Sequence, residues 1–229
     1  GKCFRLYTRW SFENELEEIT IPEIQRSNLS SVILLLKSIG VDNLNEFDFL
    51  DSPHPQALIY AYNSLLSLGA IDKLNKLTEK GKKMSEFPLE PEFSKTLIDS
   101  EKYNVLNECI KIIGLLTSGQ SIFLRNKEKN MEAEKFKKEF EKNDSDLIMF
   151  LNIYNKWELS GYSEKFAKEN FLNIKCLIRS KNISEQLIKI CKNLGLDTNK
   201  NTKMNEENIY LNIRKSFLSG FFFNVVKNN

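Results

Sequence analysis

"FDFLDSPHPQALIYAYNSLLSLGAID", residues 47–72, is the stretch that decides the fold. Its first part is predicted to be a turn, because Asp51 and Ser52 favour local side-chain-to-backbone hydrogen bonds and the two prolines fix φ. A helix is predicted over residues 56–68, since four apolar side chains fall on one helical face. They are Leu58, Tyr62, Leu65 and Leu66. Gly69 is expected to end this helix.

The segments on either side of this stretch add two more helices and a hairpin. Upstream, Ser27 or Asn28 is predicted to cap a helix that ends at Gly40. Downstream, residues 70–78 are predicted to form a strand, a tight turn and a second strand, and Thr78 is expected to cap a short helix. Helix, helix, two-stranded wing and helix, in that order, is the winged-helix pattern. The proline turn would set the angle between two helices, and Gly69 would end the second helix so that the chain turns into the wing.

The rest of the chain is predicted to be a strand at the start and helices at the end. Residues 2–8, "KCFRLYT", alternate polar and apolar side chains, which indicates a strand. From Pro91 onward, apolar residues recur at helical spacing and indicate a helical bundle. The predicted fold class is therefore mainly α, a winged helix with a small two-stranded wing packed on a helical bundle.

Composition limits the classes of function. The 229 residues include 33 basic and 31 acidic ones, so any basic site must be a local patch. Four scattered cysteines without a C-x-x-C pair, and one histidine, argue against a zinc site and fit a reducing compartment. The sequence has no phosphate-binding loop, no nucleophile elbow, no signal peptide and no apolar run of membrane-spanning length. We therefore expect an intracellular binding module without a catalytic centre, and we expect His54 to be an exposed turn residue.

Three groups of side chains are candidate binding features. Lys168, Lys175 and Arg179 are spaced by 7 and 4, which would place three cations on one helix face. This face would either contact nucleic-acid phosphates or simply be solvated. A second basic cluster surrounds the predicted wing and consists of Lys73, Lys76, Lys80, Lys82 and Lys83. The third group is an aromatic stripe, which is expected to be core and not a base-stacking platform. It consists of Phe150, Tyr154 and Trp157.

The motifs of the chain, taken in order, resemble the C-terminal region of the DEAH-box RNA helicases, which work in pre-mRNA splicing and ribosome assembly. Residues 20–40, "TIPEIQRSNLSSVILLLKSIG", resemble the entry to the winged-helix domain of that family. Residues 47–58, "FDFLDSPHPQAL", are similar to one of its most regular stretches. Residues 145–157, "SDLIMFLNIYNKW", and 169–180, "ENFLNIKCLIRS", resemble its helical ratchet domain. Residues 213–226, "IRKSFLSGFFFNVV", are similar to its last helix.

This resemblance implies a domain organisation. Residues 1–18 would be the end of the second RecA-like domain and a linker, 19–90 the winged-helix domain, and 91–229 the ratchet domain. Both RecA-like ATPase domains would precede this segment of a longer protein, and an OB-fold would follow it. The parent protein would use ATP and Mg to move along RNA, whereas residues 1–229 alone would hold no cofactor and hydrolyse no ATP.

The resemblance also implies partners and site residues. The partners would be single-stranded RNA, the RecA-like domains and OB-fold of the same chain, and a glycine-rich activator protein on the winged helix, in the nucleus and without a membrane. Lys175 and Arg179 would line the RNA side of the ratchet domain, and Asp146 and Asn152 would orient neighbouring polar groups.

The sequence departs from the family pattern in three places. Ser145, Asp146 and Leu147 stand where the family has Gly-Asp-His, and the usual Trp-Cys is replaced by Phe166 and Ala167. Lys175 stands where many members have arginine, which keeps the charge but loses the planar fork. The pattern of residues alone also fits a protein-docking scaffold that does not bind nucleic acid.

Overall fold

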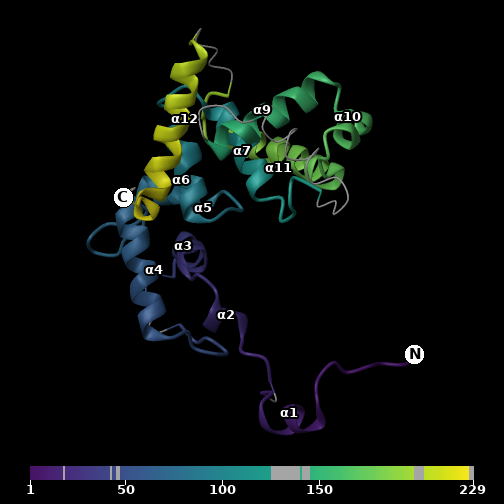
Figure 1. The fold of residues 1–229 in the computed structure, drawn as a ribbon. Helices are drawn as coiled ribbons and strands as arrows, with labels where there is room; N and C mark the ends of the chain where they lie inside the picture. Colours follow the sequence, from purple (N-terminus) through teal and green to yellow (C-terminus); the bar gives the residue numbers. More distant parts are fainter. Residues whose placement is uncertain are drawn as a thin grey trace.

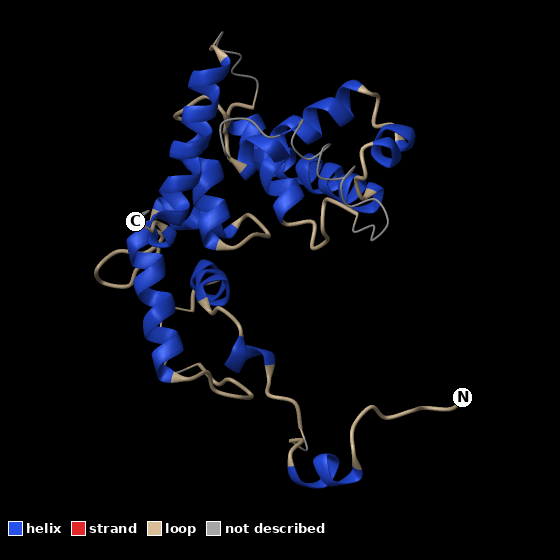
Figure 2. Ribbon diagram, in the orientation of Figure 1, coloured by secondary structure: helices blue, strands red, loops and turns tan. Residues whose placement is uncertain are grey.

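The structure is a computed structural model that describes residues 1–17, 19–41, 43–44, 47–124, 140, 145–198 and 204–226. Over these residues it is helical and contains no strand (Figure 2). The N-terminal helices are α1 (Arg9–Asn14), α2 (Glu23–Arg26), α3 (Ser30–Ser38), α4 (Pro55–Leu68) and α5 (Glu79–Ser85). The C-terminal helices are α6 (Pro91–Ser100), α7 (Leu106–Leu116), α9 (Asp146–Leu159), α10 (Glu164–Glu169), α11 (Ile174–Asn193), α12 (Glu206–Phe221) and the 3₁₀ turn η1 (Phe222–Asn224).

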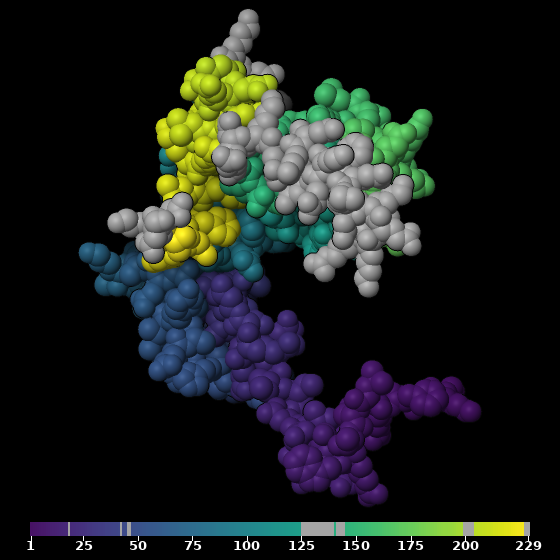
Figure 3. Space-filling model, viewed as in Figure 1, coloured from purple at the N-terminus to yellow at the C-terminus, as the bar shows by residue number. Residues whose placement is uncertain are grey.

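The first residues do not form the predicted strand. Residues 1–5 are irregular and exposed, and the short helix α1 begins after Thr8, whose side chain accepts a hydrogen bond from the Ser11 backbone N–H. This part of the chain lies apart from all the other helices (Figure 1), and the space-filling view shows it set off at one end of the molecule (Figure 3). The alternating pattern is present, but a strand needs a neighbouring strand for its backbone hydrogen bonds, and none of the described residues provides one. The prediction of a strand was therefore wrong for this structure.

Helices α3 and α4 form as the sequence predicts. The Asn28 side chain accepts a hydrogen bond from the Ser30 N–H at the start of α3. The His54 side chain, exposed in the turn as expected, accepts one from the Gln56 N–H and caps α4. Gly69 ends α4 at φ 73°, a left-handed conformation that favours glycine. The buried face of α4 is shifted slightly from the predicted one, because Ala61 and Leu68 are buried while Leu66 is exposed.

The predicted two-stranded wing is reduced to a tight turn. A single antiparallel bridge joins Ile71 to Leu77, and the Thr78 N–H donates to the Ala70 carbonyl. Within the turn, the Asp72 carboxylate accepts hydrogen bonds from the backbone N–H groups of Leu74 and Lys76. Because the Asp72 carboxylate accepts from these two N–H groups, they are not available for hydrogen bonds between two strands. Thr78 does cap α5, as predicted, by accepting from the Gly81 N–H.

A buried carboxylate connects α5 to α6. Asp99 contacts Lys95 and Lys102 at 2.8 Å and Lys80 of α5 at 3.5 Å. Burial opposes the ionisation of Asp99, but hydrogen bonds from Lys102 and Lys95 outweigh it and hold the pKa of this carboxyl well below its usual range. Burial lowers the pKa of Lys80. In contrast, the hydrogen bond from Lys102 to Asp99 raises the pKa of Lys102. Lys80 is therefore the weaker partner, although it is the one that joins the two helices.

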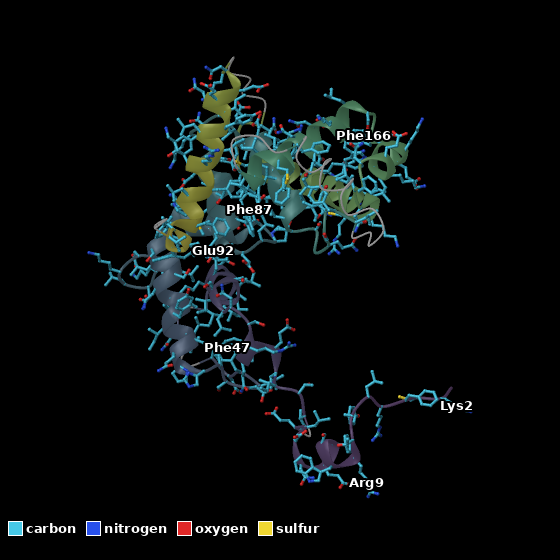
Figure 4. The ribbon with its side chains drawn as sticks, viewed as in Figure 1. Lys2, Arg9, Phe47, Phe87, Glu92 and Phe166 are labelled. Carbon is cyan, nitrogen blue, oxygen red and sulfur yellow. The ribbon has the colours of Figure 1, made fainter. Side chains whose placement is uncertain are left out.

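Helices α6 to α12 form the predicted bundle. Helix α12 packs along α6, and α11 packs along α7, which also contacts α9 (Figure 1). Two glycines allow the close approaches. A Cβ at Gly220 of α12 would lie 2.2 Å from the Glu92 carbonyl oxygen, and a Cβ at Gly114 of α7 would lie 2.5 Å from the Ser184 hydroxyl of α11. Figure 4 marks Glu92 where the lower end of α12 meets the top of α4.

The apolar core has two parts. The larger runs without interruption from Leu29 of the N-terminal helices to Phe217 of α12. The smaller lies at the outer end of the bundle, among α9, α10 and the start of α11, around the fully buried Trp157. Because the larger core is shared, the N-terminal helices α3 to α5 and the inner bundle pack as one continuous body.

The four cysteines differ in their exposure. Cys3 is exposed, whereas Cys109, Cys176 and Cys191 are buried. Burial raises the pKa of the Cys109 and Cys191 thiols to about 12, and it also raises that of Cys176. The thiolate is the form that reacts with a thiol reagent. These three thiols should therefore react slowly, because they are inaccessible and because they stay protonated.

We therefore expect maleimide at pH 8 to label one of the four cysteines in the folded protein and all four in denaturant. Mass spectrometry of the labelled chain measures this directly. A Cys3→Ser variant should remain unlabelled while folded. Rapid labelling of Cys109 in the folded Cys3→Ser protein would contradict the packing of α7 described above.

Candidate nucleic-acid interface

The strongest candidate site begins at the N-terminal end of α11. Asn173 caps this helix, since its side-chain oxygen accepts hydrogen bonds from the backbone N–H groups of Lys175 and Cys176. Cys176 and Leu177 point into the smaller core, which turns Lys175 and Arg179 outward. Both cations are exposed, and neither forms an ion pair with any residue that the structure describes. Spaced by one helical turn, they present two free positive charges on one face, as predicted.

Lys168 does not share this face. It lies on the separate short helix α10, which ends at Asn170, and it forms a 2.9 Å ion pair with Glu164. The backbone between the two helices includes Phe171 at φ 54°, so the chain changes direction before α11 begins. The prediction of three cations on one helix was therefore wrong, because the spacing of 7 crosses a helix boundary that the sequence pattern did not reveal.

A loop after α7 is fixed against the start of α11. Leu172 and Phe123 form an antiparallel bridge, and the Asn173 N–H donates to the Ile122 carbonyl at 2.8 Å. The Asn173 side-chain amide also donates to the Gln120 side chain at 3.3 Å and to the Ser121 carbonyl at 3.2 Å. This loop, residues 118–124, was not predicted to belong to the site.

The same loop passes close to the cationic face. Gly119 has φ +72°, and a Cβ built on it would lie 3.9 Å from Nη1 of Arg179. The guanidinium therefore sits beside an open, glycine-containing turn of the backbone and remains accessible to a ligand.

The two polar residues expected to support this face occupy different positions. Asp146 is exposed in the first turn of α9 and, together with Gln120 and Ser121, lines a cavity of about 340 Å³. The structure thus brings Asp146 to the loop that touches Arg179. Asn152 is half-buried and donates its amide hydrogen to the Phe140 carbonyl at 3.1 Å. This bond gives Asn152 a role in packing, and no described contact joins it to Lys175 or Arg179.

Two of the five lysines around the wing turn form ion pairs, and the other three form none with any described residue. Lys80 contacts Asp99, and Lys82 forms a 2.7 Å ion pair with Glu79. Lys73, Lys76 and Lys83 are exposed. Pairing reduces the net positive charge of this region, so it is a weaker candidate for phosphate contact than the face of α11.

The aromatic stripe of α9 is core, as predicted. Tyr154 and Trp157 are buried and meet edge to face, with ring centroids 5.9 Å apart. Phe150 is half-buried at the edge of the smaller core. Neither buried ring is available to stack on a base.

A polar cluster that the sequence did not predict holds three helices together on the same bundle. Lys111 of α7 contacts Glu158 of α9 at 2.6 Å, and Glu158 accepts a hydrogen bond from the Tyr162 hydroxyl at 3.0 Å. The ammonium of Lys181, on α11, lies 3.8 Å from the centroid of the Tyr162 ring. Burial and then the bond to Glu158 raise the pKa of Tyr162 to about 12. Because Lys111 and Lys181 are distant in the sequence from Glu158 and Tyr162, no local pattern links the cluster.

Comparison with known protein families agrees with this architecture. Residues 61–89 match the family described as the winged-helix part of the helicase-associated domain HA2. Residues 90–150 match the family described as its ratchet-like part. The chain therefore carries the two helicase-associated domains that occur in DEAH-box helicases, and it fits the C-terminal region of such a helicase. None of the helices in the described ranges is long and apolar enough to cross a membrane.

Proposed function

We propose that this chain is the RNA-channel and hub module of an ATP-dependent DEAH-box RNA helicase that works in the nucleus, in splicing or ribosome assembly. The observation that carries the proposal is the pair Lys175 and Arg179, exposed on one face of α11 and free of described acidic partners. Two uncompensated cations one turn apart match the phosphates of a single strand. The matches to helicase-associated domains supply the context in which a strand would be present.

The module would act mechanically. RecA-like domains that bind ATP and Mg, contributed by the parent protein, would open and close and so move RNA stepwise. The ratchet bundle would form one wall of the channel, and the winged helix would be the rigid hub. Continuous core packing from Leu29 to Phe217 supports this rigidity, because a shared core resists relative motion of its parts. The chain by itself would bind no nucleotide and hydrolyse no ATP.

A protein-docking role remains the second candidate. A cavity of about 540 Å³ opens between α3 and the end of α5, and its apolar lining favours a protein ligand. The apolar residues are Leu34, Leu35, Met84, Phe87 and Leu89. Within the helicase this surface would receive a glycine-rich activator, whereas in a scaffold protein it would be the main binding site.

The test of RNA contact is a double substitution, Lys175→Ala with Arg179→Ala, in the full-length protein. We expect the affinity for single-stranded RNA to fall about tenfold, since charge-assisted phosphate contacts contribute about 1 kcal/mol or less each when exposed. Fluorescence anisotropy with a labelled RNA measures this. The matched control replaces two other exposed lysines, Lys165 of α10 and Lys192 on another face of α11, and should bind normally. Equal affinity of the double variant and the wild type would favour the scaffold.

A further inference from the structure

The cavity beside the cationic face has the lining of a small-ligand site. It lies among the end of α7, the loop 118–124 and the first turn of α9, with a volume of about 340 Å³. That volume is within the range of pockets that hold small molecules. Its lining is mostly apolar, with three polar side chains at the rim. The lining residues are Leu115, Leu116, Gln120, Ser121, Ile122, Phe123, Asp146, Met149 and Phe150.

Two half-buried phenyl rings and one carboxylate define what this cavity could hold. Phe123 and Phe150 are both only partly covered by the protein, so their rings are available to a flat apolar ligand. Asp146 is exposed and forms no ion pair with any described residue. A carboxylate repels phosphate, so the cavity itself is unsuited to the backbone of a nucleic acid. It suits a planar group that offers hydrogen-bond donors.

The hydrogen bonds within the protein determine which donors and acceptors of the cavity lining are left to bind a ligand. The Gln120 side-chain oxygen accepts from Asn173, which leaves the Gln120 amide hydrogens for a ligand. The Ser121 hydroxyl donates to the Phe123 carbonyl at 2.9 Å and is therefore already used as a donor. The site thus presents a two-oxygen acceptor at Asp146 and a donor at Gln120.

We propose that this cavity receives one unstacked nucleobase of the bound single strand and prefers guanine. Guanine offers two neighbouring N–H donors, on N1 and N2, to one carboxylate, and its O6 can accept from an amide. The other bases offer only one donor position on the same edge. The proposal rests on the proposed function, because it requires a strand on α11. It adds a base contact to the phosphate contacts of Lys175 and Arg179.

The geometry allows both contacts to be made by one strand. The loop 118–124 lines the cavity on one side and approaches the Arg179 guanidinium through Gly119 on the other. A single strand that follows this loop would therefore meet both the Arg179 guanidinium and the cavity. Repulsion by Asp146 would keep the phosphates on the α11 side and direct the base inward.

The experiment uses the full-length protein and U-rich RNAs of about 12 nucleotides with one central guanosine, inosine or uridine. Inosine lacks the N2 amino group and removes one donor. We expect the guanosine RNA to bind about fivefold more tightly than the uridine RNA. This preference is at the low end of the range for a bidentate base contact, because Asp146 is exposed. Inosine should lose most of this gain. Asp146→Asn should abolish the preference, so that the guanosine, inosine and uridine RNAs bind this variant with equal affinity.

The outcomes separate this inference from the proposed function. If Lys175→Ala with Arg179→Ala weakens all three RNAs equally while the guanosine preference persists, both ideas are supported. If the wild type binds all three RNAs equally but the double variant binds them more weakly, the base pocket is wrong and the phosphate face stands. If Asp146→Asn weakens all three RNAs to the same extent, Asp146 acts on the fold of the loop, and the base pocket is again wrong.

Discussion

Replacing Asp99 with alanine is expected to lower the free energy of unfolding of this chain by about 3 kcal/mol, the low end for breaking a buried ion pair. The Asp99 side chain is only 8% exposed and is shared by Lys80, Lys95 and Lys102. Without it, three ammonium groups would face one another around a buried gap. The low end applies because Lys102 is largely exposed and can turn into solvent. Urea-induced unfolding, followed by circular dichroism, measures the change.

The control for this substitution is Glu79→Ala, which removes an acid whose pair with Lys82 is fully exposed. Such a pair contributes little to stability, so we expect the loss for Glu79→Ala to be clearly smaller than the loss for Asp99→Ala. If Asp99→Ala costs no more than Glu79→Ala, the three-lysine cluster does not stabilise the junction of α5 and α6.

Acid should remove the same stabilisation. The pKa of Asp99 is lowered in the folded chain, so its contribution is fully present above the ordinary value of about 4 and is lost as the pH falls below it. The advantage of the wild type over Asp99→Asn should therefore shrink progressively from about pH 4 to pH 2 and go on shrinking below that. A constant difference between the two proteins across that interval would show that the carboxylate does not act through its charge.

The second large effect is expected at Gly81 in α5. A Cβ at this position would lie 2.0 Å from the Ala70 carbonyl oxygen and 2.8 Å from Leu77 Cδ1. The Ala70 carbonyl also accepts hydrogen bonds from the backbone and the hydroxyl of Thr78, so it cannot move away without breaking the wing turn. Gly81→Ala gains about 1 kcal/mol of helix propensity but should lose about 3 kcal/mol or more to overpacking.

The expected net loss for Gly81→Ala is thus about 2 kcal/mol or more, measured by the same urea titration. The matched control is Lys83→Ala in the same helix, which is exposed and should change stability by less than about 0.5 kcal/mol. A Gly81→Ala protein as stable as the wild type would mean that α5 and the wing turn are not in close contact.

Much of this fold could be predicted from local sequence signals. His54, Thr78 and Asn173 cap helices by accepting backbone hydrogen bonds, and the helix starts at His54 and Thr78 were placed from the sequence. Gly69 ends α4 where the pattern predicts. Caps and helix stops depend on neighbouring residues, so the sequence contains the information they need.

The errors arose where the deciding partner is distant or unexpected. The wing lost its strands because the Asp72 side chain competes for the backbone donors of the turn. Residues 2–8 lack a strand to pair with, although their pattern alternates. Lys168 was wrongly assigned to the face of Lys175, because the sequence pattern did not reveal the break between α10 and α11. The bridge from Leu172 to Phe123 lies at this break and joins residues that are far apart in the sequence.

The shared helix face of the two cations could be predicted from the sequence, but the residues around that face could not, and contact with RNA stays a prediction. Lys175 and Arg179 share a face through a spacing that the sequence displays directly. Asn152 turned out to bond to the Phe140 carbonyl, and Gln120 was not considered at all. The loop that carries Gln120 joins the site through hydrogen bonds to Asn173, and such long-range pairing cannot be read from one sequence.

The measurement that tests the central claim most directly is the salt dependence of single-stranded RNA binding by the full-length protein. The logarithm of the association constant falls linearly with the logarithm of the salt concentration, with a slope of about −0.7 for each phosphate neutralised on a single strand. If Lys175 and Arg179 hold phosphates, replacing both with alanine should make the slope shallower by about 1.4, whereas the Lys165 and Lys192 control should keep the wild-type slope. A double variant with the wild-type slope and affinity would contradict the account, because the two cations would then be a solvated surface of the bundle.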